Sequence, residues 1–87
     1  MKVRVEQRHI KAGRRHDPCR CPIALAVWEE LPTECPEVAD GFVFMGGHEY
    51  MLTVEACTFV HRFDRGEMVE PFEFELRTDD SAEGGEK

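Results

Sequence analysis

Alternation of apolar and polar residues marks two short stretches near the ends of this chain. Residues 2–6 alternate strictly, with Val3 and Val5 on the apolar side, and residues 72–76 alternate in the same way. Alternation with a period of two is typical of a strand that buries one face. Both stretches are therefore predicted to be half-buried β-strands whose other face is charged and solvated.

A nearly unbroken apolar stretch from Cys21 to Leu31 predicts a short helix. Pro22 suits the first helical position, where its missing N–H costs nothing and its φ is already set. Apolar residues cover almost every side of this helix, so all sides are expected to be buried. In so short a chain, this predicts a sheet on one side and a second copy of the protein on the other. We therefore expect a homodimer or a higher homo-oligomer.

A second helix is predicted between Thr53, which can cap its start, and Gly66, which can end it. Its apolar residues recur at intervals of three and four, as on one face of a helix. They are Ala56, Phe59, Val60 and Phe63. This is the clearest amphipathic pattern in the chain, and it predicts a helix that packs one side on the core.

Weaker local signals fill the remaining segments. Gly46-Gly47 separates two β-prone runs and predicts a hairpin over residues 41–53, because glycine adopts positive φ without steric cost. Residues 7–12 predict one or two helical turns that stop at Gly13. Residues 32–37 contain two prolines and are predicted to form a loop.

These elements predict an α+β fold, with a mostly antiparallel sheet of about four strands and two to three helices packed on one face. We expect residues 1–77 to form a single compact domain. Residues 78–87 lack apolar anchors and are predicted to be a disordered acidic tail. No apolar run reaches the about 18 residues of a membrane span, and the N-terminal residues lack the core of a signal peptide. The expected location is the cytoplasm.

Charge is divided unevenly along the chain, whose formal net charge is −7. Residues 1–20 hold seven of the eleven basic side chains and two of the eighteen acidic ones. The acidic remainder argues against DNA as a partner, because phosphate neutralisation needs a basic surface. Two interpretations of the basic segment stay open. It pairs with acidic residues within the fold or across a dimer, or it grips a small anion.

Candidate ligand-binding residues gather just before the central helix. Arg14, Arg15, His16 and Arg20 precede a helix N-terminus, and arginine offers paired donors to phosphate. Trp28 would pack against the base of a nucleotide ligand. The alternative is structural, with Arg15 paired to an acidic residue, the other basic residues solvated and Trp28 in the core.

Cysteine and histidine side chains are candidates for metal ligands and for catalysis. His16, Cys19 and Cys21 are the metal candidate, but no second pair follows at ligand spacing, so we expect no bound metal. Cys57 and His61 are four residues apart on a predicted helix and could touch. A catalytic thiolate also needs a lowered pKa and an exposed cleft, which a chain of this size seldom provides. The protein is predicted not to be an enzyme and to use no cofactor.

Four short motifs occur together between residues 3 and 76. They are His9-Ile10-x-x-Gly13-x-Arg15, Cys21-Pro22-Ile23-Ala24-Leu25-Ala26, Phe63-Asp64-x-Gly66 and Val69-x-Pro71-Phe72-x-Phe74. This combination resembles a family of short, uncharacterised proteins carried by bacteriophages and prophages, especially of actinobacteria. The resemblance implies a phage accessory protein that acts in the cytosol of an infected bacterium.

Small phage proteins often act by binding, and the functional hypotheses follow from that setting. The first is a non-enzymatic binding protein for host takeover or defence evasion, in its most concrete form a sponge that sequesters a nucleotide immune signal. The second is a protein–protein interaction module that inhibits a host factor through its acidic surface. The third is a small zinc-stabilised domain.

Overall fold

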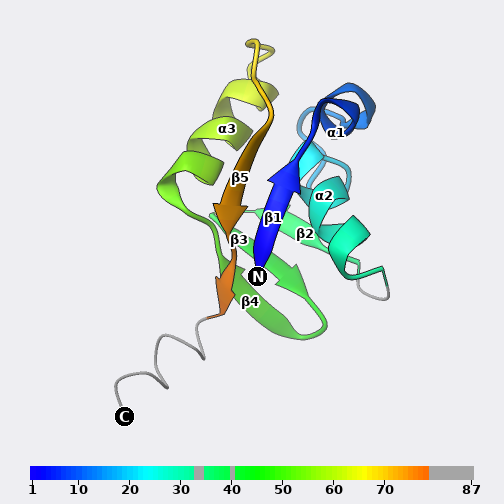
Figure 1. The fold of residues 1–87 in the computed structure, drawn as a ribbon, viewed down its shortest axis with the longest axis vertical. Helices are drawn as coiled ribbons and strands as arrows, with labels where there is room; N and C mark the ends of the chain where they lie inside the picture. The colour runs from blue at the N-terminus through cyan, green and yellow to red at the C-terminus, as the bar shows by residue number, and fades with distance from the viewer. Residues whose placement is uncertain (33–34, 40, 79–87) are drawn as a thin grey trace.

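Strands from opposite ends of the chain form the first of two sheets. The computed structural model describes residues 1–32, 35–39 and 41–78 (Figure 1). Strand β1 (Lys2–Val5) pairs antiparallel with β5 (Phe72–Glu75), and Val3 lies opposite Phe74. The alternation predicted for both strands is confirmed, because Val3 and Phe74 are buried while their neighbours along each strand are exposed.

Two helices lie beside β1 (Figure 1). Helix α1 (Gln7–Ala12) leads through a connector to α2 (Pro22–Glu30), as predicted. Helix α2 contacts α1, β1 and a strand of the second sheet, β2 (Glu37–Ala39). One chain thus supplies three neighbours for the apolar helix. Self-association, which we inferred from the breadth of its apolar surface, stays a prediction.

The second sheet is built around the predicted hairpin. Strands β3 (Phe42–Met45) and β4 (His48–Met51) pair antiparallel across a two-residue turn. Both turn glycines have positive φ, 57° at Gly46 and 79° at Gly47, which is the geometry that glycine was expected to supply. The hairpin is confirmed.

Two short strands extend this hairpin into a four-stranded sheet. Strand β2 pairs with β3, and β6 (Arg77–Thr78) pairs with β4, which gives the order β2-β3-β4-β6. Neither short strand was predicted, and β2 begins where the sequence indicated a loop. Strands of two or three residues carry too little alternation to be recognised, because their pairing depends on a partner distant in sequence.

Helix α3 (Val54–Asp64) follows the second sheet and packs beside β5 (Figure 1). The side-chain oxygen of Thr53 accepts a hydrogen bond from the N–H of Ala56 at 3.1 Å, so the predicted cap is confirmed. Phe59 is buried against Phe72, with ring centroids 4.8 Å apart. The helix ends before Gly66, whose φ is +82°.

The fold is α+β with antiparallel pairing, as predicted, but the strands divide between two small sheets. Leu76 lies where the chain passes from β5 in one sheet to β6 in the other. It is 2 % exposed, and its N–H donates to the carbonyl oxygen of Met1 at 2.7 Å. Alternation identifies strands and their buried face, but it does not specify which strands pair. The single sheet of the prediction therefore becomes two.

The structure describes the first residue of the segment 78–87, which we predicted to be a disordered tail. Thr78 belongs to strand β6, and the remaining tail residues, 79–87, lie outside the described residues. Within the part of the chain that the structure describes, no helix has the length and hydropathy needed to cross a bilayer.

Candidate functional site

The residues predicted to bind a ligand lie mostly in one closed loop, residues 14–20, here called the basic loop. The N–H of Arg14 donates to the carbonyl oxygen of Arg20 at 2.9 Å and ties the two ends of the loop together. Inside it, the N–H of Arg20 donates to the carbonyl of Asp17 at 3.1 Å, and the Asp17 carboxylate accepts from the N–H of Cys19 at 3.1 Å. The structure therefore brings Arg14 and Arg20 to adjacent positions.

Gly13 holds the start of the basic loop against the first turn of α2. A Cβ placed on Gly13 would lie 2.6 Å from Cδ of Pro22, so no larger residue fits without a shift. The φ of Gly13 is −71°, which any residue can adopt. Helix α1 stops before Gly13, as predicted, although this glycine does not adopt the left-handed conformation that is common at such an end. Gly13 also allows close approach of α1 to α2.

The C-terminal end of α3 holds the middle of the basic loop. The N–H of His16 donates to a carboxylate oxygen of Asp64 at 3.0 Å, and the imidazole Nδ1 lies 4.0 Å from the other. His16 has a φ of 59°, a left-handed conformation that this contact supports. Nη1 of Arg15 lies only 2.6 Å from the position that a Cβ on Gly66 would take. The guanidinium of Arg15 therefore packs closely on this glycine. Three of the four sequence motifs thus meet at this corner.

The arginines of the basic loop differ from four of the five other arginines in their partners. Arg14, Arg15 and Arg20 are exposed, and none forms an ion pair with a residue that the structure describes. Four arginines elsewhere each pair with a glutamate. They are Arg4, Arg8, Arg62 and Arg65. The loop therefore gathers cationic side chains that have no carboxylate partner in the described part of the chain.

The N-terminus of α2 does not add donors to this cluster, contrary to the expectation from the sequence. Cys21 is buried, and its Sγ accepts the N–H of Ala24 at 3.4 Å. Pro22 has no N–H to offer. Burial raises the pKa of the Cys21 thiol to about 11, so the side chain is a neutral cap at neutral pH. Ligand binding at this corner would depend on the side chains of the loop.

Trp28 lies away from the basic loop. It is six residues beyond Pro22, which corresponds to about 9 Å along the helix axis. Its ring N–H donates to the carbonyl oxygen of Pro32 at 3.1 Å, and 38 % of the residue is exposed. The structure therefore does not bring this aromatic side chain together with the arginines.

The structure does not bring the candidate metal ligands His16, Cys19 and Cys21 together as a metal site. Cys21 is buried as a helix cap, whereas His16 is exposed beside Asp64. Within residues 1–32, 35–39 and 41–78, no group of three or more His, Cys, Asp or Glu side chains is placed to hold a metal ion. Cys57 and His61 do line one hollow of about 450 Å³ between α3 and the second sheet.

A polar cluster at the contact of α1 and α2, in which His9 is buried and Arg8 and Glu29 are exposed, was not predicted. His9 is 5 % exposed, its Nδ1 accepts the N–H of Glu6 at 2.8 Å, and its Nε2 lies 3.1 Å from a carboxylate oxygen of Glu29. Arg8 donates to the same carboxylate through two nitrogens. Its hydrogen bonds hold the pKa of Glu29 below the usual value, with a smaller contribution from His9. Both ring nitrogens of His9 are occupied, so the cluster stabilises the helix contact.

Comparison of this chain with protein-family models, with curated proteins and with solved structures found no match. The basic loop and its surroundings are therefore interpreted from their own geometry and chemistry.

Proposed function

We propose that the protein is a small non-enzymatic binding protein that holds a phosphate-bearing ligand, such as a nucleotide, on the basic loop. One observation carries this proposal. Arg14, Arg15 and Arg20 occur in one closed loop without a carboxylate partner among the described residues, on a chain whose net charge is −7. Unpaired arginines gathered on an acidic protein are suited to a small anion and not to a long nucleic acid.

The acidic residues nearest the loop have other partners. The Asp17 carboxylate accepts from the N–H of Cys19, and Asp64 accepts from the N–H of His16. These bonds fix the backbone of the loop before any ligand arrives, which lowers the entropy lost on binding. Each charge-assisted contact between arginine and phosphate contributes roughly 1.5–3 kcal/mol. Two or three such contacts would supply roughly 3–9 kcal/mol, which corresponds to affinities from the millimolar to the micromolar range.

The position of Trp28 favours recognition of phosphate over recognition of a base. A ligand on the loop would contact the arginines and His16, and its base would find no partner in Trp28. In the phage setting that the sequence resemblance implies, such a protein would act as a sponge that sequesters a signalling nucleotide of the host.

The proposal is tested by titration calorimetry with pyrophosphate and with a panel of cyclic dinucleotides. We expect saturable binding that the double variant Arg14→Ala/Arg20→Ala weakens about tenfold or more, which corresponds to a loss of about 1.4 kcal/mol. The matched control is Arg77→Ala in β6, since Arg77 is also exposed and forms no ion pair with a described residue. It should leave affinity within about twofold of the parent value. Absence of binding, or equal losses in both variants, would reject the site.

A further inference from the structure

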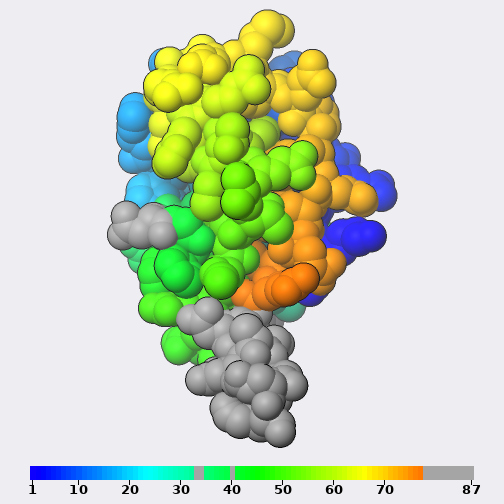
Figure 2. Space-filling view, turned by 90° about the vertical axis from the view of Figure 1, so that its left-hand side faces the viewer, coloured from blue at the N-terminus to red at the C-terminus, as the bar shows by residue number. Residues whose placement is uncertain are grey.

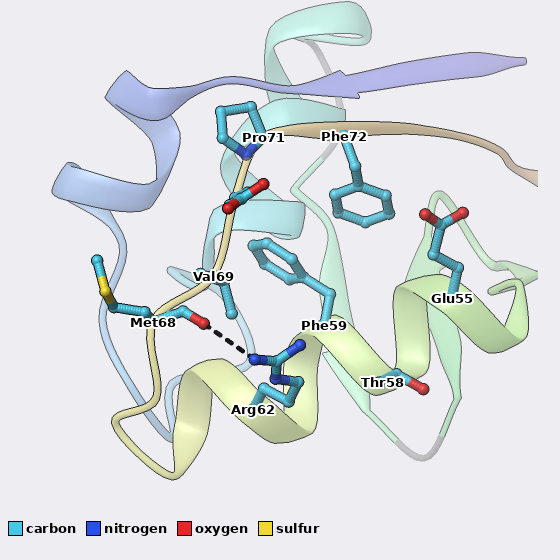
Figure 3. A pocket seen from close by; sticks show the side chains of 9 residues that line it. Glu55, Thr58, Phe59, Arg62, Met68, Val69, Pro71 and Phe72 are labelled. Atoms are coloured by element: carbon cyan, nitrogen blue, oxygen red, sulfur yellow. Dashed lines mark hydrogen bonds between the residues drawn. The ribbon is translucent and has the colours of Figure 1, made fainter.

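A groove runs between α3 and the segment 68–72 that leads into β5 (Figure 3). Its volume is about 650 Å³. One wall is the face of α3 that carries Glu55, Thr58, Phe59 and Arg62. Figure 2 shows α3 and the chain around β5 side by side on one face of the molecule. We call this feature the α3 groove.

The floor of the α3 groove is apolar. Phe59 and Phe72 stack with an angle of 29° between their rings, and Val69 and Pro71 extend the apolar lining. Met68 stands at one end and is 88 % exposed (Figure 3). An exposed methionine next to an apolar hollow is typical of surfaces that bind other chains, because its flexible thioether adapts to many shapes.

The second wall of the groove is held in place by polar contacts at its start. Arg62 donates through Nε to Glu67 at 3.1 Å and through Nη2 to the carbonyl oxygen of Met68 at 3.4 Å. Arg65 donates to the other oxygen of Glu67 at 2.9 Å. These bonds occupy Arg62 and hold the pKa of Glu67 below its usual value. The groove is therefore formed before any partner binds.

The backbone along this wall is unpaired. Strand β1 pairs with β5 only as far as Val5 and Phe72, because the chain then turns into α1. No backbone hydrogen bond joins the N–H groups of Val69 and Glu70 to another described residue. An extended peptide can pair with such a free edge and place alternate side chains in the adjoining hollow.

The charged residues that line the α3 groove indicate which kind of peptide would bind there. Glu55 and Glu70 line the groove, and neither forms an ion pair with a residue in the described part of the chain. The one cation in the lining, Arg62, is held by the Glu67 carboxylate, which it shares with Arg65, and the two lining glutamates outnumber it. The groove is thus apolar at its floor and acidic at its rim. We propose that it is the docking site for an extended, basic segment of a partner protein, with a bulky apolar side chain seated on Phe59 and Phe72.

This inference uses no residue of the basic loop, and the two proposals are tested separately. The probe is a short fluorescent peptide that alternates lysine with leucine around a central phenylalanine. A counterpart with glutamate in place of lysine is the control peptide. We expect saturable binding of the basic peptide by fluorescence anisotropy and no binding of the acidic one.

Matched variants locate the binding site. Glu55→Lys/Glu70→Lys should weaken binding of the basic peptide about tenfold or more, while Glu37→Lys/Glu49→Lys makes the same charge change at exposed positions on the second sheet. Met68→Ser tests the apolar contact and should weaken binding several-fold, since Met68 is exposed and its loss leaves the core intact. Melting curves verify that each variant is folded.

Three results would overturn the inference. The first is binding of the acidic peptide as tightly as the basic one. The second is an equal loss in the groove variant and in Glu37→Lys/Glu49→Lys, which would reveal general charge attraction. The third is self-association by light scattering that Met68→Ser abolishes, which would make a second copy of the chain the occupant of the groove.

Discussion

Two neighbouring parts of the N-terminal basic segment use arginine in opposite ways. In residues 1–12, Arg4 pairs with Glu73 at 2.9 Å across the first sheet, and Arg8 binds Glu29 of α2. In the basic loop, which follows directly, the arginines have no carboxylate partner among the described residues. The ion-pairing interpretation therefore holds for Arg4 and Arg8 in residues 1–12, and anion binding by the basic loop stays a proposal.

Register and helix packing explain the difference. Val3 and Val5 face the core, so Arg4 faces outward, and antiparallel pairing sets Glu73 directly opposite. The basic loop belongs to no sheet, and although Val38 of β2 donates to the carbonyl oxygen of Pro18 at 2.8 Å, no described carboxylate forms an ion pair with a loop arginine. Its own acid, Asp17, is occupied by a backbone N–H. Whether a basic segment is structural or free to bind thus depends on the elements that carry it and not on its charge count.

The strongest test of this comparison targets Gly13, the residue between the two parts. Gly13→Ala forces a Cβ to within 2.6 Å of Pro22 and should destabilise the fold by about 3 kcal/mol. The control is Gly47→Ala, where nothing lies within 4 Å and only the positive φ is disturbed, at a cost of about 1 kcal/mol. Urea denaturation measures both. A smaller loss at Gly13 than at Gly47 would show that the loop is not anchored on α2.

The next test concerns Cys21, where the basic loop joins α2. The pKa of its thiol rises from 9.0 to about 11 on folding, because burial disfavours the thiolate. The unfolded chain therefore loses this proton first, and stability that is intact below pH 9 declines as the pH rises toward 11. The loss amounts to about 2–3 kcal/mol. Cys21→Ser should remove this alkaline decline in denaturation curves, and Cys35→Ser, at an exposed position, should retain it.

A third test addresses His9, the buried member of the polar cluster between α1 and α2. His9→Phe keeps a ring in place but leaves the N–H of Glu6 without an acceptor, which should cost about 2 kcal/mol. His48→Phe changes an exposed histidine on β4 and should leave the melting temperature nearly unchanged. Equal melting temperatures for the two variants would mean that the α1–α2 contact does not depend on this imidazole.

The smallest expected effect compares the two classes of arginine directly. Arg4→Ala removes an exposed ion pair and should lower stability by at most about 1 kcal/mol, and the difference should vanish in about 1 M salt. Arg14→Ala should not change stability at either salt concentration. If Arg14→Ala costs as much as Arg4→Ala in dilute buffer, the loop arginine has a structural partner and the contrast between the two parts fails.

Local patterns anticipated those parts of the fold whose signals lie within one element. The stripe of α3, the cap at Thr53 and the Gly46-Gly47 hairpin are examples, because each depends on residues a few positions apart. Strands β2 and β6 were missed, and so was the division into two sheets. These features depend on register between distant segments, which residue periodicity does not encode.

The candidate site shows the same limit. Residue type identified Arg14, Arg15 and Arg20 as suited to an anion, but not the bond that closes their loop. The contact of His16 with Asp64 joins residues 48 positions apart, so neither one predicts the other. The sequence does contain a weak local signal for the role of His9, because Glu6 stands three residues before it at the start of α1. The α3 groove left no local signal, because its walls come from two elements.

The pairing of β1 with β5 also governs how the protein can be made. Val3 lies opposite Phe74, so the first strand has no sheet partner until about 70 further residues have been synthesised. At translation rates of roughly 5–20 residues per second, the ribosome needs about 4–14 s to deliver that partner. During this interval Val3 and Val5 present an apolar strand edge in the growing chain, while the hairpin and α3, whose contacts are local, can form at once. The first sheet consequently closes only when nearly all of the described chain has been synthesised, shortly before β6 becomes available to pair with β4.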